Sequence, residues 1–244
     1  MKKRLLYNLT FLIVLNMTAN AQTTPEKPSR WSLSLSAGPS FPTGTFASND
    51  RLSSESGHAR IGAGAELALT YWLNRRFGLV FAAAGQENAI GTFTSLPDPG
   101  FGNVTIENDP WKIARFLAGG TFSHPLSARL SFDIRALAGL LKTSIPGYTY
   151  HTNSGSGQSN VQSDGHAPGF SLPWTFAYEA GAGLQWQSPG RLFLRLDAAY
   201  TGADPRLHQE FTITVNGATT GTGTIEHKQP IGALQLGLGA GLRL

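Results

Sequence analysis

Eight segments of the chain alternate apolar and polar residues with a period of two, which is the spacing of side chains on the two faces of a β-strand. They are residues 31–41, 59–72, 77–89, 111–123, 128–141, 174–187, 191–202 and 231–244. Each is at least as long as the roughly 9–11 tilted residues that cross a bilayer. Because a bilayer core requires every backbone group to be paired internally, only helices and closed barrels span it. The pattern predicts an all-β fold, an eight-stranded antiparallel transmembrane up-and-down β-barrel.

The connections between these segments alternate in length. Tight turns are expected at residues 74–76, 124–127 and 188–190, and long loops at residues 42–58, 90–110, 142–173 and 203–230. Short turns on the periplasmic side and long loops on the outer side are typical of outer-membrane barrels. An even number of strands then places both ends of the barrel in the periplasm.

The first residues have the features of an export signal. A basic stretch at residues 2–4 precedes an apolar run at residues 5–15 and an Ala-x-Ala motif at residues 19–21, which is the order found in secretory signal peptides. We expect a cleaved signal peptide over residues 1–21, a short periplasmic segment over 22–30 and the barrel domain over 31–244. This organisation predicts a location in the cell outer membrane of a double-membraned, Gram-negative bacterium.

Charge and cysteine content exclude several classes of function. Three of the 19 basic residues lie in the signal peptide, which leaves 16 against 15 acidic residues, so nucleic-acid binding is not expected. The absence of cysteine excludes disulfides, thiolate metal sites and a cysteine nucleophile. The six histidines form neither an HxH nor an HxxxH pair, so no metal and no cofactor are expected.

The alternation also predicts which face of the sheet meets lipid. In the last segment Leu234, Leu236 and Leu238 share one face, whereas Gln235 and Arg243 share the other. An arginine on the lipid face costs roughly 2–4 kcal/mol at the bilayer midplane, so the apolar face should point outward. The alternative is a water-soluble, lipocalin-like barrel with its apolar face inward, but the charged residues are too sparse to solvate its exterior.

The inward face of the strands then carries eight charged residues, four acidic and four basic. This lumen charge cluster comprises Glu66, Arg115, Asp133, Arg135, Glu179, Arg195, Asp197 and Arg243. An eight-stranded barrel is just wide enough for side chains to fill its interior, and buried charges must be paired. The cluster predicts a salt-bridged, closed lumen. A gated proton or ion path and a pair of catalytic carboxylates are the alternatives.

Aromatic residues fall near both ends of the expected strands, where amphipathic rings prefer the headgroup depth of a bilayer. The expected periplasmic girdle is Trp31, Tyr71, Phe77, Phe122 and Trp186, and the outer girdle is Phe176, Tyr178 and Tyr200. Two belts of this kind favour a membrane-spanning barrel over a soluble one.

One loop holds the residue types of a hydrolase. Ser154 lies three residues after His151, with Asp164 nearby, but residues 153–160 have the composition of a flexible linker. Catalysis needs groups held on rigid elements, so the set is attributed to chance and no enzymatic activity is expected. A lipid-modifying enzyme would need such a pair on upper, outward strand positions, where none is found.

The long loops carry strand signals of their own. Residues 211–215 and 218–225 flank Asn216-Gly217, the strongest short signal of a β-hairpin, and residues 101–106 have a similar composition. We expect a protruding ribbon that binds a protein partner by strand addition, or a passive surface hairpin. A hairpin that entered the membrane would give ten strands and favour a narrow channel for ions or small solutes. Nine acidic against four basic loop residues predict an acidic outer surface.

The eight segments and the terminal strand resemble the small outer-membrane β-barrel families of the OmpX, OmpA transmembrane-domain and PorT-like type. The last strand reads Leu236-Gly-Leu-Gly-Ala-Gly-Leu-Arg-Leu244 and departs from those families by lacking a final aromatic residue. The resemblance covers residues 30–244 in pattern. It implies a non-enzymatic structural or surface-interaction role, internal ion pairs similar in kind to the lumen charge cluster, and contact with lipopolysaccharide, other outer-membrane lipids and the barrel-insertion machinery.

Overall fold

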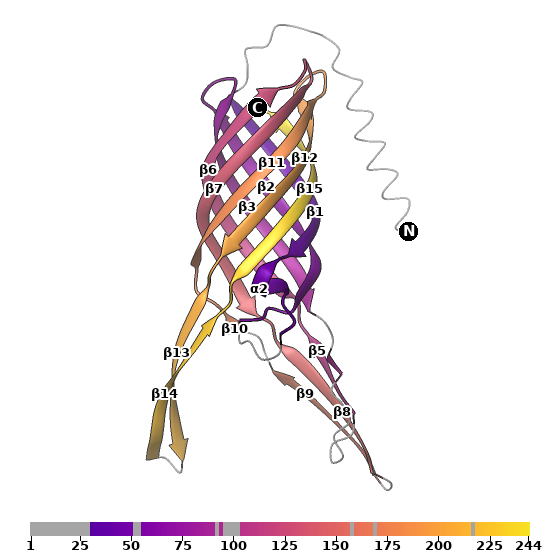
Figure 1. Ribbon diagram of the computed structural model, residues 1–244, viewed down its shortest axis with the longest axis vertical. Helices are drawn as coiled ribbons and strands as arrows, with labels where there is room; N and C mark the ends of the chain where they lie inside the picture. The colour runs from indigo at the N-terminus through magenta and orange to yellow at the C-terminus, as the bar shows by residue number, and fades with distance from the viewer. Residues whose placement is uncertain are drawn as a thin grey trace.

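Eight antiparallel strands close into a barrel in the computed structural model, which describes residues 30–50, 55–90, 93–94, 103–156, 159–167, 170–215 and 218–244. The strands are β1 (Trp31–Pro42), β2 (Ala59–Trp72), β3 (Phe77–Ile90), β6 (Trp111–Pro125), β7 (Leu130–Ile145), β11 (Thr175–Gln187), β12 (Leu192–Ala203) and β15 (Ile231–Arg243). Each pairs with the next in this order, and β15 pairs with β1 (Figure 1). The predicted fold class is confirmed.

The tight turns lie at one end of the barrel, the turn end, together with the start of β1 and the end of β15 (Figure 1). Oδ1 of Asn74 accepts hydrogen bonds from the backbone N–H groups of Arg76 and Phe77, each at 2.8 Å, the geometry by which asparagine favours a turn. Gly190 lies between β11 and β12 at a φ of 104°, which a side chain would strain. The long connections extend from the opposite end, the loop end.

The fourth long connection forms a ribbon of its own. Among the described strands, β13 (Arg206–Val215) and β14 (Ala218–Lys228) pair only with each other and extend away from the barrel (Figure 1). The expected hairpin pairing is therefore present, although Asn216-Gly217 lies outside the described residues. Because the ring closes with eight strands and without this ribbon, the ten-stranded alternative is wrong.

The second and third long connections share a small sheet. Its order is β4 (Phe93–Thr94), β5 (Asn103–Asn108), β8 (Tyr148–Ser156) and β9 (Ser159–Ala167). The expectation of a flexible linker over residues 153–160 is wrong, because β8 and β9 stay paired as far as Ser156 and Ser159. Backbone hydrogen bonds hold such a ribbon, so a Gly/Ser-rich composition does not prevent pairing when a neighbouring strand, here β5, supplies a further partner.

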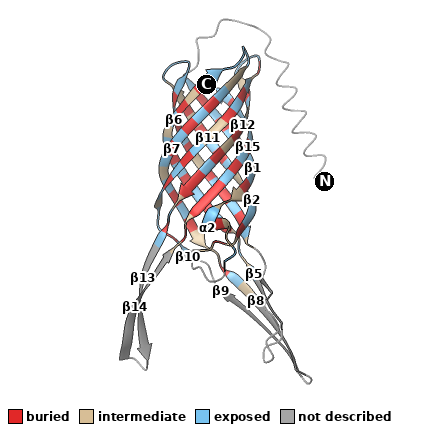
Figure 2. Cartoon of the chain, viewed as in Figure 1, coloured by how far each residue is buried: buried red, intermediate tan, exposed pale blue. Residues whose placement is uncertain are grey.

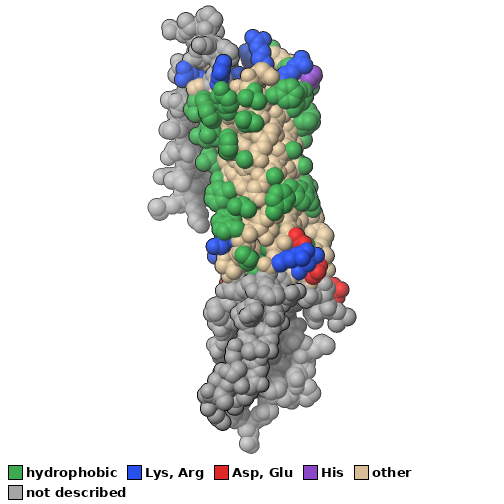
Figure 3. Space-filling view, turned by 90° about the vertical axis from the view of Figure 1, so that its left-hand side faces the viewer, with side chains coloured by type: hydrophobic (Ala, Val, Ile, Leu, Met, Phe, Trp, Pro, Cys, Tyr) green, Lys and Arg blue, Asp and Glu red, His purple; other side chains and the backbone are tan. Residues whose placement is uncertain are grey.

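The middle of the barrel carries apolar side chains outside and charged side chains inside. Exposed and buried residues alternate along its strands (Figure 2). Leu238 is 70% exposed, whereas Arg115 is 2% exposed. Figure 3 shows hydrophobic side chains over the wall, Lys and Arg at the turn end, and further Lys and Arg beside Asp and Glu toward the loop end. The predicted orientation of the strands is confirmed, and the lipocalin-like alternative does not fit it.

The first long connection folds back onto the loop end of the barrel through a short helix, α2 (Gly44–Ala47) (Figure 1). Phe46 of this helix is fully buried, and its ring meets that of Trp111 edge-on, with 5.6 Å between centroids. Nε1 of Trp111 donates a 2.8 Å hydrogen bond to the carbonyl oxygen of Gly57, which fixes the far end of the connection. No helix in the described ranges is long and apolar enough to cross a membrane.

This apolar mouth cap consists of Phe46, Trp111, Ile113, Leu141 and Ile231, which belong to one cluster of buried residues. Strands β6 and β15 are four places apart in either direction around the ring. A cluster that joins Trp111 of β6 to Ile231 of β15 therefore spans the mouth of the barrel. The alternating pattern does not predict the cap, because Phe46 lies outside the alternating segments.

Replacing Phe46 by alanine should destabilise the barrel, because the change leaves a cavity beside Trp111. Phe→Ala changes in a core cost about 3–5 kcal/mol, and we expect a loss of this order in the free energy of unfolding, measured by denaturant titration in detergent micelles. Phe176→Ala is the control, since Phe176 is 65% exposed, and it should cost less than about 1 kcal/mol. Equal losses would contradict a buried cap.

Candidate functional site

The charged residues inside the barrel form one ion-pair network. Glu66 of β2, Arg115 of β6, Arg135 of β7 and Glu179 of β11 are all buried inward-facing residues. Arg135 holds Glu66 through two hydrogen bonds, from Nη1 to Oε1 at 2.5 Å and from Nη2 to Oε2 at 2.9 Å. Its Nη2 also lies 2.7 Å from Oε1 of Glu179. These four residues are the lumen network.

Arg115 closes the other side of the lumen network. Its Nε lies 3.4 Å from Oε2 of Glu179, and its Nη2 lies 4.0 Å from Oε2 of Glu66. Each carboxylate thus meets both guanidinium groups, and the formal charges cancel. Strands β2 and β11 are four places apart around the ring, so the link from Glu66 through Arg135 to Glu179 crosses the whole lumen.

Neutral polar groups add hydrogen bonds to the lumen network. Nη1 of Arg115 donates to Oε1 of Gln86 at 3.0 Å, and its Nη2 donates to Oε1 of Gln235 at 2.7 Å. Oγ1 of Thr201 donates to Oε2 of Glu179 at 3.2 Å. Buried charges cost several kcal/mol each unless they are paired and hydrogen-bonded. These contacts supply part of the hydrogen bonding, whereas Nε of Arg115 and Nε of Arg135 donate no hydrogen bond to the described residues.

A count of formal charges does not find Gln86, Gln235 and Thr201. The period-two alternation is what could have found them in the sequence, because each occupies an inward position of its strand. Gln235, for example, lies on the polar face of the last alternating segment. Charge patterning therefore outlines the site, and the uncharged inward residues around it add hydrogen bonds.

The other four residues of the predicted lumen charge cluster lie outside the lumen network. Arg195 and Asp197 form an ion pair on β12, with 3.3 Å between Nε and Oδ1, and Asp197 also interacts electrostatically with Arg135. Asp133 is buried, and its Oδ1 accepts no hydrogen bond from the described residues. Asp133 interacts electrostatically with Arg243, which is exposed at the turn end. The structure thus divides the predicted cluster, because Asp133 and Arg243 lie nearer the turn end than the network does.

Inward glycines make room for the charged side chains. A Cβ added at Gly237 would lie 2.8 Å from Oδ2 of Asp197, and one added at Gly181 would lie 3.2 Å from Nε of Arg135. Both contacts are closer than ordinary packing of a β-carbon allows. These glycines therefore serve the packing of the lumen.

The arrangement offers no free catalytic group within the lumen network, because each carboxylate is engaged by two arginines. In the small loop sheet, the backbone register sets His151 opposite Asp164, whereas Ser154 pairs with Val161 three positions along, roughly 10 Å away along the strand. The register therefore does not bring the three hydrolase-type residues to one point. Within the described ranges, no group of three His, Asp or Glu residues is placed to hold a metal ion.

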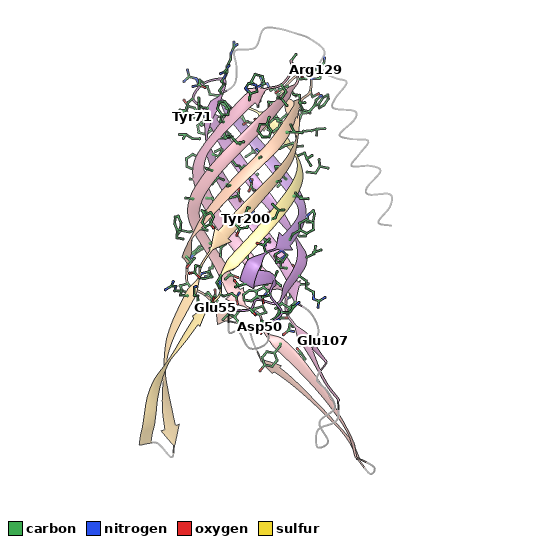
Figure 4. The ribbon with its side chains drawn as sticks, viewed as in Figure 1. Asp50, Glu55, Tyr71, Glu107, Arg129 and Tyr200 are labelled. Carbon is green, nitrogen blue, oxygen red and sulfur yellow. The ribbon has the colours of Figure 1, made fainter. Side chains whose placement is uncertain are left out.

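Aromatic side chains of the wall lie at the turn end. The rings of Trp31 and Tyr71 are 4.7 Å apart, and those of Phe77 and Phe122 are 5.1 Å apart, measured between centroids. Trp186 is exposed on β11 near the same end. The structure therefore gathers the residues of the expected periplasmic girdle at one end, where Figure 4 shows Tyr71.

A second group of aromatic side chains lies toward the loop end. Tyr178 and Tyr200 have ring centroids 6.4 Å apart, and Phe176 is exposed beside them on β11. Trp174, just before β11, has its ring centroid 5.9 Å from that of Phe116. This tryptophan joins the aromatic residues at the loop end although the expected outer girdle does not include it.

Replacing Arg135 by methionine should destabilise the barrel, because it removes the guanidinium that links the two carboxylates of the lumen network. Removing one partner of a buried ion pair costs about 3–5 kcal/mol, and we expect a loss of this order in the free energy of unfolding in micelles. Arg195→Met is the matched control and should cost less, since Arg195 is the more exposed and pairs with one carboxylate. A larger loss for Arg195→Met would contradict a central role of the network.

No protein-family model matches the chain, and no curated protein sequence matches it. Among solved structures it is similar to Neisserial surface protein A, at 10% identity and a TM-score of 0.49 over 90% of this chain and 100% of that one. It is similar to Ail, the attachment invasion locus protein of Yersinia pestis, at 15% identity and 0.41 over 88% and 100%. It is also similar to the outer membrane protein OprG from Pseudomonas aeruginosa, at 9% identity and 0.42 over 89% and 98%.

Proposed function

We propose that the protein is an integral β-barrel of the outer membrane of a double-membraned bacterium. It reaches that membrane through a cleaved signal peptide and the barrel-insertion machinery. The wall of the barrel supports this placement, since Leu35, Leu67 and Leu196 are 47–59% exposed while the charged side chains of the lumen network are buried. Exposing so much apolar surface is unfavourable in water and favourable in lipid.

The aromatic residues of the wall and the arginines of the tight turns support the same placement. Rings gathered at the turn end and toward the loop end suit the two headgroup regions of a bilayer. Arg75, Arg76 and Arg129 are exposed at the turn end, where Figure 4 shows Arg129, and their charges suit lipid phosphates. The band between the two ends is the part that lies in the acyl chains.

The lumen of the barrel is closed, and its closure supports a non-enzymatic, non-conducting role. The observation that carries this conclusion is the link of Glu66, Arg135 and Glu179 across the whole lumen. The mouth cap adds a second, apolar layer at the loop end. Ions would have to displace both layers to pass.

The long loops carry the contact with the surroundings. Strands β13 and β14 extend away from the barrel as a two-stranded ribbon, and the small loop sheet has β4 and β9 at its edges (Figure 1). Open strand edges bind extended segments of other proteins by adding a strand. Asp50, Glu55 and Glu107 lie at this end (Figure 4). Lys228 pairs with Glu55, but the four long loops hold nine acidic against four basic residues, so a protein partner with basic residues beside an extended segment fits them best.

Leu67→Arg should destabilise the barrel in lipid vesicles. Leu67 is an outward residue in the middle of β2, and an arginine on the lipid face costs about 2–4 kcal/mol near the midplane. Leu126→Arg is the control, because Leu126 is exposed in a tight turn and should change the free energy of unfolding by less than about 0.5 kcal/mol. If the two variants unfold with the same free energy, the wall does not face acyl chains.

Planar-bilayer recordings test the closed lumen. The protein should give no discrete conductance steps, whereas a Phe46→Ala/Arg135→Ala variant, which opens both closing layers, should give them. Arg129→Ala, which removes an exposed arginine at the turn end, should stay silent. Regular steps from the unaltered protein would overturn the closed lumen and make a narrow channel the better function.

A further inference from the structure

A groove of about 690 Å³ lies on the outer wall near the loop end. Its floor is a row of exposed small residues that are register partners on neighbouring strands, Ala37, Ala65, Gly85 and Ala114. The row continues on β7 with Lys142, the partner of Ala114. The groove is open space, since a Cβ added at Gly85 would meet no atom within 4 Å.

The groove slopes along the barrel wall because the strands are tilted. The register partners that follow from Glu66 across β3 and β6 lead to Leu141 on β7. Glu66 is nevertheless hydrogen-bonded to Arg135, which lies on β7 six residues nearer the turn end than Leu141. Rows of register partners therefore climb toward the loop end from β1 to β7. Lys142 marks the end of the groove nearest the loops, and Ala37 marks its deep end. With strands about 4.8 Å apart, the floor is roughly 19 Å long.

Two lysines stand at the loop end of the groove. Ala114 of β6 is the register partner of Lys142 of β7, and Lys112 lies two residues before Ala114 on the same face of β6. Lys112 is therefore the diagonal neighbour of Lys142. Such diagonal positions are about 7–8 Å apart, which is within reach of long side chains. Nζ of Lys142 lies 5.8 Å from the ring centroid of Trp174, which holds it over the wall. Glu87, the register partner of Lys112, offsets one charge and leaves a net charge of +1.

A second groove of about 510 Å³ lies one row deeper on the same strands. Its lining includes the register partners Leu67, Ala83, Phe116 and Leu140. Each of these residues is two positions along its strand from a residue of the first row, on the turn-end side, and therefore lies on the same outward face. The two grooves therefore run side by side on one side of the outer wall. Neighbouring acyl chains of a single lipid need such parallel grooves.

We propose that these grooves bind a phosphorylated, multiply acylated glycolipid, with its phosphate at Lys112 and Lys142 and its acyl chains along the two rows. The inference rests on the proposed membrane placement, which makes lipid the medium at the wall. The lysines select an anionic headgroup by charge complementarity, and the loop end selects the outer leaflet, where such a bacterium keeps its phosphorylated glycolipid. Ser144 and Ser171 line the same end and supply hydroxyl groups for the sugar.

Native mass spectrometry of the refolded barrel in micelles tests this site, with a diphosphorylated, hexa-acylated glucosamine disaccharide as the probe. Each lysine near a membrane surface contributes about fivefold in affinity for an anionic lipid, so Lys112→Gln/Lys142→Gln should weaken binding by more than about tenfold. Glu87→Gln removes the offsetting carboxylate and should strengthen it by about fivefold. Gly85→Leu fills the open floor without changing charge and should also abolish tight binding.

Matched control variants keep the result specific. Arg75→Gln/Arg76→Gln removes the same charge at the turn end, and Gly120→Leu adds the same side chain at an exposed position where a Cβ has 4.0 Å of clearance. Both controls should bind the probe as the unaltered protein does. Equal binding by the double lysine variant, by Gly85→Leu and by the unaltered protein would overturn the site.

The choice of lipid and the underlying placement are tested separately. Binding of the dephosphorylated disaccharide, or of phosphatidylglycerol, as tightly as the probe would overturn the glycolipid assignment. Gel migration of unheated and heated samples reports folding in the same preparations. A folded barrel without selective binding contradicts this inference alone, whereas a mature chain that stays monodisperse without detergent contradicts the proposed membrane function as well.

Discussion

The pairing of β15 with β1 is the constraint on which the rest of the structure depends. Partners run from Ser32 and Arg243 at the turn end to Pro42 and Ala233 at the loop end, so the ring has no free edge along its length. An open sheet would leave a row of unpaired N–H and C=O groups, which a bilayer core does not tolerate. Closure also separates two environments, since period-two alternation can place apolar side chains outside and charged ones inside only when the sheet has an inside.

Closure makes the interior small, and the interior is filled in layers. The mouth cap closes the loop end with Phe46 and Trp111, and the lumen network lies beneath it with equal positive and negative charge. Each buried donor left unpaired is costly, so the amides of Gln86 and Gln235, which accept hydrogen bonds from Arg115, stabilise the network. The two layers fill the same lumen by different physical means.

The alternating pattern predicts the eight strands, their faces and the inward charges, because each of these depends only on neighbours along the chain. It does not predict that Arg135 meets Glu66, since that contact depends on the tilt of the strands and on the register around the ring. The burial of Phe46 depends on how a connection folds back, and the pairing of β5 with β8 joins two connections. Strand position is thus a local property of this sequence, whereas partners across the lumen and between loops are not.

Strand tilt shapes both faces of the wall at once. Inside, it brings Glu66 level with Arg135 although their register rows are six residues apart on β7. Outside, the same offset turns the row from Ala37 to Lys142 into a slope that rises along the wall toward the loop end. The segment Gly85-Gln86-Glu87 takes part in both, because Gln86 accepts from Arg115 in the lumen while its neighbours line the groove. A side chain added at Gly85 therefore changes the outer surface of the wall and leaves the hydrogen bond of Gln86 in place.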